Sequence, residues 1–142
     1  DLPLEEATEF SEIATEYNLD LILLVAPTTP STRMKSISKK SKGFIYLVSV
    51  TGVTGERNNL ENRVENLITE LKNISTNPIA VGFGISSPKH VQKVKKWGAD
   101  GVIVGSAFVK RIYESDRKSI IKEIGGFCKE LRLAADDMWF DL

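Results

Sequence analysis

Two short apolar runs in this chain end in glycine, and residues that favour a helix start follow each of them. The first run is Pro78–Val81, continued by Gly82–Ser86, and the second is Gly101–Val104, continued by Gly105–Ala107. Glycine lets a backbone approach a ligand closely, and a helix that begins just after it offers free N–H groups to an anion. The two segments therefore predict strand ends that bind an anion.

Strand ends of this kind, about twenty residues apart, are typical of the last two strands of a TIM-type barrel. In that fold a phosphate site lies after strands seven and eight. We therefore expect a phosphorylated small molecule as the substrate. The glycines can instead serve only tight packing between a strand and the next helix, and this alternative stays open.

Four apolar runs predict four parallel strands joined by helices. The runs are Leu21–Val25, Phe44–Val48, Ile79–Val81 and Val102–Val104, and their first residues are 23, 35 and 23 residues apart. The shorter intervals suit a strand, a turn and a short helix. The longer interval leaves room for a long loop over Ser49–Asn59, and long loops in compact domains are usually functional.

Apolar stripes between and after the strands predict amphipathic helices. The stripes are Phe10, Ile13, Ala14 and Tyr17; Leu60, Val64, Leu67, Ile68 and Leu71; Val91, Val94 and Trp97; and Ile120, Ile121, Ile124, Phe127, Cys128 and Leu131. The third helix has Ser87 as its expected N-cap, Pro88 in its first turn and Gly98 after its end. We expect Cys128 to be a small core residue and His90 to face solvent.

The charge balance and the single cysteine exclude several classes of protein. The chain has 142 residues, enough for one domain over residues 1–142, with 19 basic and 19 acidic side chains. This balance gives no reason to expect nucleic acid or an anionic membrane as a partner, and Lys35–Lys42 is expected to be a solvated helix end. One cysteine excludes an intrachain disulfide, and one histidine excludes a histidine-rich metal site. No apolar run approaches the length of a membrane span.

The length of the chain limits the barrel interpretation. A full eight-stranded barrel needs about 200 residues or more, and this chain supplies four strand–helix units. The four strands form either an open doubly wound sheet or part of a barrel, and the glycine pattern favours the barrel. Because the first residue is Asp1 and not Met, we expect a trimmed chain or a fragment.

Several segments, in this order along the chain, resemble the tryptophan synthase alpha subunit family. They are Asp1–Glu6, Tyr46–Ser49 followed by Gly52–Gly55, Gly82–Pro88 and Gly98–Ala107. The opening segment is similar to the family's stretch just after the fourth barrel strand, and the match extends to about Arg111. The resemblance implies the C-terminal part of a TIM (β/α)8 barrel, strands 5 to 8 with their helices.

The resemblance also implies an activity and a partner. The family splits indole-3-glycerol phosphate into indole and glyceraldehyde 3-phosphate by a retro-aldol reaction, as a step of tryptophan biosynthesis. Indole then passes through a tunnel to a separate beta subunit in an alpha2beta2 complex. The pyridoxal phosphate of that complex belongs to the beta subunit, so no cofactor is expected in this chain. The pathway implies a plastid stroma or the cytoplasm as the compartment.

The family's site residues carry over onto matching positions of this sequence. The resemblance implies a phosphate site at Gly55, Gly84, Gly105 and Ser106, and an indole site at Leu24, Tyr46, Phe83 and Ile103. Thr54 would close over the substrate and support a catalytic aspartate, and Asp1 and Pro3 would face the beta subunit. The family's catalytic glutamate and aspartate lie before Asp1. Glu56 stands where the family suggests a small residue, and the tail Asp136–Leu142 matches nothing that we can place.

Four alternatives remain open at this stage. A sugar-phosphate epimerase or isomerase shares the strand-end glycines but not the Gly52–Gly55 segment. A stand-alone indole-3-glycerol phosphate lyase that releases free indole shares every motif. A non-catalytic partner that activates a beta subunit shares them too. A flavodoxin-like receiver is the structural alternative, but the acidic cluster expected at its strand ends is absent from this sequence.

Overall fold

One parallel sheet forms the centre of the molecule. The computed structural model describes residues 2–48, 57–82 and 84–136. Within them the strands are β1 (Leu23–Val25), β2 (Ile45–Val48), β3 (Ile79–Gly82) and β4 (Gly101–Ile103). Each strand pairs in parallel with the next one in sequence, so the order is β1-β2-β3-β4. The four predicted strands are confirmed, with ends that differ by one or two residues.

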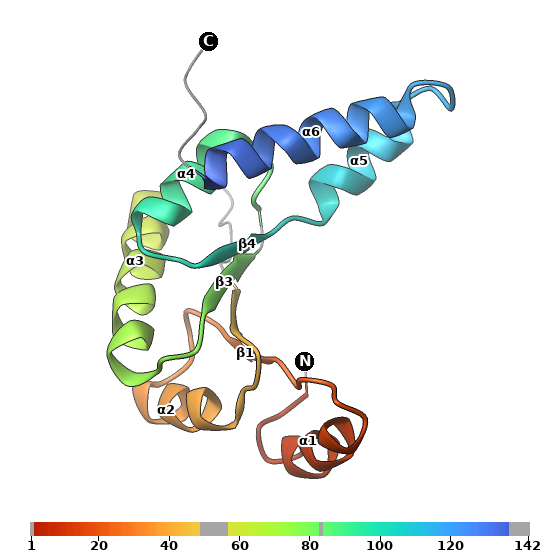
Figure 1. Ribbon diagram of the computed structural model, residues 1–142. Helices are drawn as coiled ribbons and strands as arrows, with labels where there is room; N and C mark the ends of the chain where they lie inside the picture. Colours follow the sequence, from red (N-terminus) through yellow and green to blue (C-terminus); the bar gives the residue numbers. More distant parts are fainter. Residues whose placement is uncertain (1, 49–56, 83, 137–142) are drawn as a thin grey trace.

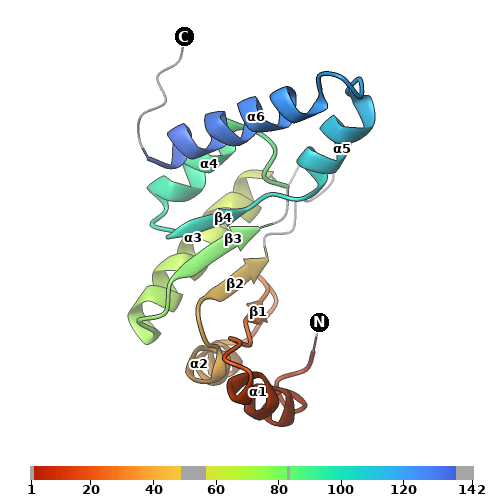
Figure 2. The same ribbon diagram turned by 45° about the vertical axis from the view of Figure 1, so that its right-hand side comes forward.

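The helices that connect the strands cover one face of this sheet (Figures 1 and 2). They are α2 (Ser31–Lys40), α3 (Arg57–Ile74) and α4 (Pro88–Lys96), which contact β1, β3 and β4 respectively. A doubly wound sheet instead has a point where the strand order reverses and carries helices on both faces. The described sheet therefore does not fit the open doubly wound alternative or the flavodoxin-like receiver.

Three further helices precede the first strand or follow the last one. The first, α1 (Ala7–Glu16), precedes β1, while α5 (Ser106–Glu114) and α6 (Ile120–Ala135) follow β4. In Figure 1, α6 runs along α4 and α5, and both pairs are in contact. The helices α2 and α5 were not predicted in full. Only Met34 and Ile37 give α2 a buried apolar side, too few for a recognisable stripe.

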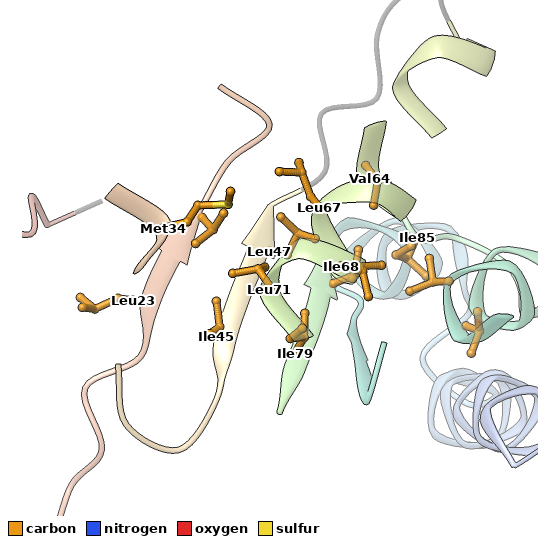
Figure 3. Packing of buried hydrophobic residues seen from close by; sticks show 14 of the residues in the cluster. Leu23, Met34, Ile45, Leu47, Val64, Leu67, Ile68, Leu71, Ile79 and Ile85 are labelled. Atoms are coloured by element: carbon orange, nitrogen blue, oxygen red, sulfur yellow. The ribbon is translucent and has the colours of Figure 1, made fainter. Parts of the chain in front are cut away.

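The core lies between the sheet and the connecting helices. The strand residues Leu23, Val25, Ile45, Leu47, Ile79 and Val81 are all buried. They occupy alternate strand positions, so their side chains share one face of the sheet. Figure 3 shows the α3 side chains of Leu67, Ile68 and Leu71 among those of the strands. Burial of each such side chain contributes about 1.5–3 kcal/mol to folding.

Two sequence predictions about helix faces were wrong. The α1 stripe is not covered: Phe10 is 55% and Tyr17 73% exposed, and the buried residue of this helix is Ala7. The reason is its place beside β1, an edge strand with no further strand next to it in the described part of the chain. Cys128 is exposed and not a core residue. Phe127 and Leu131 of the predicted α6 stripe are buried, together with Ala134.

Candidate functional site

The carboxyl ends of the parallel strands meet at one edge of the sheet. Val48 of β2 pairs with Gly82 of β3, and Gly82 pairs with Ile103 of β4. Gly84 and Gly105 each come two residues after a member of the last pair. Both glycines therefore follow the carboxyl ends of adjacent strands and lie at the same edge of the sheet, as the sequence motifs predict.

The second glycine opens a helix toward solvent. Gly105 is the N-cap residue of α5, and its carbonyl accepts the N–H groups of Phe108 at 2.9 Å and Val109 at 3.2 Å. The first N–H groups of α5 have no acceptor within the helix. Gly105 and Ser106 are exposed, and a Cβ at position 105 would meet no atom within 4 Å. An anion could thus reach the positive end of the α5 dipole.

The first glycine sits in the turn between β3 and α4. Gly84 has a φ of 75°, a left-handed conformation that a residue with a Cβ rarely adopts. Ile85 is buried, and the Ser87 side chain accepts the N–H of His90 at 3.4 Å as the N-cap of α4. Pro88 begins the helix and Gly98, with a φ of 94°, follows it. The predicted start and end of this helix are confirmed.

His90 is exposed, as predicted, but sequence reasoning missed its contact. Its Nδ1 accepts the N–H of Ser86 at 3.3 Å and lies 3.4 Å from the Ser86 hydroxyl. A signal was available, because His90 is the third residue of a helix capped by serine. A side chain at that position can reach back to the residues before the helix.

The predicted indole residues of the strands share the face that no connecting helix covers. Leu24 pairs with Tyr46 and Tyr46 with Ala80, while Gly82, two residues after Ala80, pairs with Ile103. Leu24, Tyr46 and Ile103 are half-buried. The three side chains therefore share the face of the sheet opposite to the connecting helices, which is its concave side.

Several predicted residues cannot be placed in this arrangement. Thr54, Gly55, Phe83 and Asp1 lie outside the described residues. Pro3 is exposed, and its carbonyl accepts the N–H of Glu6 at 3.0 Å. The loop predicted over Ser49–Asn59 is too long at its far end, because α3 begins at Arg57.

Carboxylates with a shifted pKa have structural partners. A hydrogen bond from Arg33 lowers the pKa of Glu5, and hydroxyl groups of Ser115 and Ser119 lower that of Glu123. Partial burial alone would raise the pKa of Asp100, but hydrogen bonds from Lys72 and the Ile79 N–H outweigh it and lower the pKa.

In residues 2–48, 57–82 and 84–136, no three His, Cys, Asp or Glu side chains gather to hold a metal ion. The strand-end geometry thus suits binding of an anion attached to an apolar group.

None of the helices within the described residues is long and apolar enough to cross a membrane.

Comparisons with known proteins match this geometry to one family. The family model described as "Tryptophan synthase alpha chain" matches residues 1–135. A tryptophan synthase alpha chain of Prochlorococcus marinus subsp. pastoris is 73% identical over 136 residues, which cover 96% of this chain and 49% of the relative. That of Trichodesmium erythraeum is 53% identical over 134 residues, covering 94% and 51%.

Solved structures agree with the sequence comparisons. A structure of the tryptophan synthase α2β2 complex from Pyrococcus furiosus has a TM-score of 0.80 and 42% identity, over 93% of this chain and 53% of that one. The alpha subunit from Campylobacter jejuni has a TM-score of 0.78 and 37% identity, over 89% and 51%. The chain spans about half the length of the curated relatives it matches. The expected fold class, about four parallel strand–helix units from the C-terminal part of a (β/α)8 barrel, is confirmed.

Proposed function

The chain belongs to the tryptophan synthase alpha chain family, and on this premise we propose that it is the C-terminal half of an indole-3-glycerol phosphate lyase. Residues 1–142 form one structural unit that contributes strands 5 to 8 of the barrel. The complete barrel cleaves indole-3-glycerol phosphate by a retro-aldol reaction to indole and glyceraldehyde 3-phosphate. The reaction serves tryptophan biosynthesis.

One observation carries the proposal: Gly84 and Gly105 leave adjacent strands at one edge, next to the open N-terminus of α5. A phosphate dianion needs several converging N–H donors, and a helix N-terminus supplies them with a favourable dipole. Gly84, Gly105 and Ser106 hold the phosphate in this proposal. Gly55 adds a further backbone N–H from the segment after β2.

The indole ring lies on the concave side of the sheet. Leu24, Tyr46 and Ile103 contact it from three strands, which the register places on one face. Phe83 completes this apolar wall. Thr54 closes over the substrate as part of a lid and hydrogen-bonds the catalytic aspartate.

The chemistry itself needs groups that we assign to residues before Asp1. A retro-aldol cleavage requires a base for the glycerol hydroxyl and an acid for the indole carbon. A glutamate and an aspartate of the preceding half of the barrel supply these functions. The 142-residue chain alone is therefore expected to be catalytically inactive.

The proposed partner is a tryptophan synthase beta subunit. The similar protein from Pyrococcus furiosus is part of an α2β2 complex, and we place the exposed Pro3 and the neighbouring Asp1 at the corresponding contact. Pyridoxal phosphate belongs to the beta subunit, so this chain carries no cofactor. The compartment we propose is the cytoplasm or a plastid stroma.

A chimeric enzyme tests the function directly. This chain would replace the matching segment, 49% of the length, of the Prochlorococcus marinus subsp. pastoris alpha chain. We expect the chimera to release indole from indole-3-glycerol phosphate, and to release it faster when a beta subunit is present. A folded chimera that releases no indole in either condition contradicts the proposal.

The same assay separates the related alternatives. A stand-alone lyase would release free indole equally fast without the beta subunit. A non-catalytic partner would accelerate the beta subunit's own reaction and release no indole.

A further inference from the structure

The turn between β3 and α4 holds one half of the proposed phosphate site. It contains Gly84 in a left-handed conformation, with a φ of 75°, and it ends at Ser87, the N-cap of α4. Among the described residues of this turn, Ile85 is buried in the core, whereas Gly84 and Ser86 are exposed. The directions of the backbone N–H groups at the strand end therefore depend on what fixes the remaining residues of the turn.

Two side chains fix the turn by a reciprocal pair of hydrogen bonds. The Ser87 hydroxyl accepts the N–H of His90 at 3.4 Å, and Nδ1 of His90 accepts the N–H of Ser86 at 3.3 Å. This arrangement resembles a capping box, in which glutamate or glutamine at the third helical position reaches back to the start of the helix. Here an imidazole takes the place of the carboxylate or amide.

His90 contributes through this hydrogen bond and not through packing. Its side chain is exposed, whereas Val91 and Val94 form the buried side of α4. The bond to Nδ1 turns the Ser86 N–H toward α4. The Ser86 N–H belongs to the peptide unit that follows Ile85, so the bond lies close to Gly84 in the chain.

We propose that His90 is a positioning residue for the phosphate group, acting through the Ser86 N–H. The inference rests on the phosphate site of the proposed function and adds a residue to it. His90 does not touch the phosphate itself. It keeps the turn at Gly84 in the conformation that binds the anion.

Two substitutions separate the hydrogen bond from the volume of the side chain. His90→Leu removes the acceptor and retains a side chain of moderate size. His90→Gln retains an acceptor that can reach back from the third helical position. Lys96→Leu, on the same helix and exposed, is the control for an added apolar side chain.

The experiment is a titration of the chimeric enzyme with inorganic phosphate, followed through the amide resonances of Gly84 and Gly105. We expect His90→Leu to weaken phosphate binding about three- to tenfold, because one hydrogen bond is lost. His90→Gln should restore most of the affinity, and Lys96→Leu should leave it unchanged. The Ser86 amide proton should shift upfield in His90→Leu only.

Three results would overturn the inference. The first is an affinity of His90→Leu for phosphate equal to that of the unsubstituted protein. The second is an equal loss of phosphate binding in His90→Leu and His90→Gln. The third is a Ser86 amide resonance that does not change in His90→Leu. In each of these the unsubstituted chimera binds phosphate, so the proposed function is unaffected. An unsubstituted chimera that binds no phosphate removes the phosphate site and this inference together.

Discussion

The ring of Tyr46 occupies the space where any other residue at position 82 would place its Cβ. A Cβ on Gly82 would lie 2.5 Å from both Cε2 and Oη of Tyr46, and 2.8 Å from its Cζ. Tyr46 pairs with Ala80 in the register of β2 and β3, so its ring extends diagonally to the next position on the same face. The glycine therefore lets Tyr46 lie across the concave side of the sheet.

Gly82→Ala should displace this ring. We expect the free energy of unfolding to fall by about 1–3 kcal/mol, as for other overpacked sites, measured by urea unfolding. Gly101→Ala is the matched control, because a Cβ there meets only the Ala80 Cβ at 3.8 Å, an ordinary contact.

Truncation of the ring in the same background checks the cause. In a Tyr46→Ala chain the substitution Gly82→Ala should cost much less, because the clashing atoms are gone. An equal cost in both backgrounds would show that the backbone, and not Tyr46, requires glycine at position 82.

Two buried serines at the C-terminal end of α2 differ in their hydrogen bonding. The Ser41 hydroxyl accepts the Leu23 N–H at 3.0 Å and donates to the Phe44 carbonyl at 2.7 Å. The Ser38 hydroxyl is also buried but has no hydrogen-bond partner among the residues that the structure describes.

Ser41→Ala should therefore lower the free energy of unfolding by about 1–3 kcal/mol, because it leaves a buried N–H and a carbonyl unsatisfied. Ser38→Ala should be neutral or stabilising, since it removes a buried hydroxyl without a partner. Urea unfolding of both variants gives the comparison. Equal losses for the two serines would contradict this interpretation.

Asp100 ties the start of β4 to α3 and β3. Its carboxylate accepts Lys72 Nζ at 2.7 Å and the Ile79 N–H at 2.8 Å. These contacts lower its pKa in the folded chain. The stabilisation is thus present above the unfolded pKa of about 3.9 and is lost as the pH falls through the folded value.

Asp100→Asn should cost about 1 kcal/mol or less at neutral pH, because both side chains of the ion pair are 40% exposed and water screens them. The difference between wild type and variant should shrink below about pH 4. Urea unfolding across this range measures it, with Glu114→Gln in the exposed Lys110–Glu114 pair as the control. A difference that stays constant with pH would assign the effect to packing.

The sequence predicted the strands because each one is a continuous apolar run. The strand residues on the concave side of the sheet, such as Leu24 and Tyr46, are as apolar as the buried residues on the other side. They are nevertheless only half-buried in the described sheet. Only the end of α2 was predicted, because charged and hydroxyl residues surround Met34 and Ile37. Cys128 was misplaced because only part of the predicted α6 stripe, including Phe127 and Leu131, is buried, and Cys128 lies outside that part.

Part of the candidate site was also readable from sequence. Gly84 and Gly105 each follow one of two adjacent strands by two residues. Parallel pairing brings the carboxyl ends of these strands to one edge of the sheet. The contact between His90 and Ser86 was not foreseen, because the usual helix-start signature has glutamate or glutamine at that position. Local backbone geometry, and not residue type alone, decides where the imidazole points.

The most direct test of the phosphate site is Gly105→Asp in the chimeric enzyme. Nothing lies within 4 Å of a Cβ at this position, and its φ of −117° is accessible to any residue. Aspartate is also a favourable N-cap for α5, so the fold and its stability should be retained.

The measurement is KM for indole-3-glycerol phosphate, with Gly125→Asp on the exposed side of α6 as a control of equal charge. Two negative charges in contact cost several kcal/mol, so KM should rise about a hundredfold or more in Gly105→Asp and stay unchanged in Gly125→Asp. A folded Gly105→Asp enzyme with the KM of the unsubstituted chimera would show that the phosphate binds elsewhere.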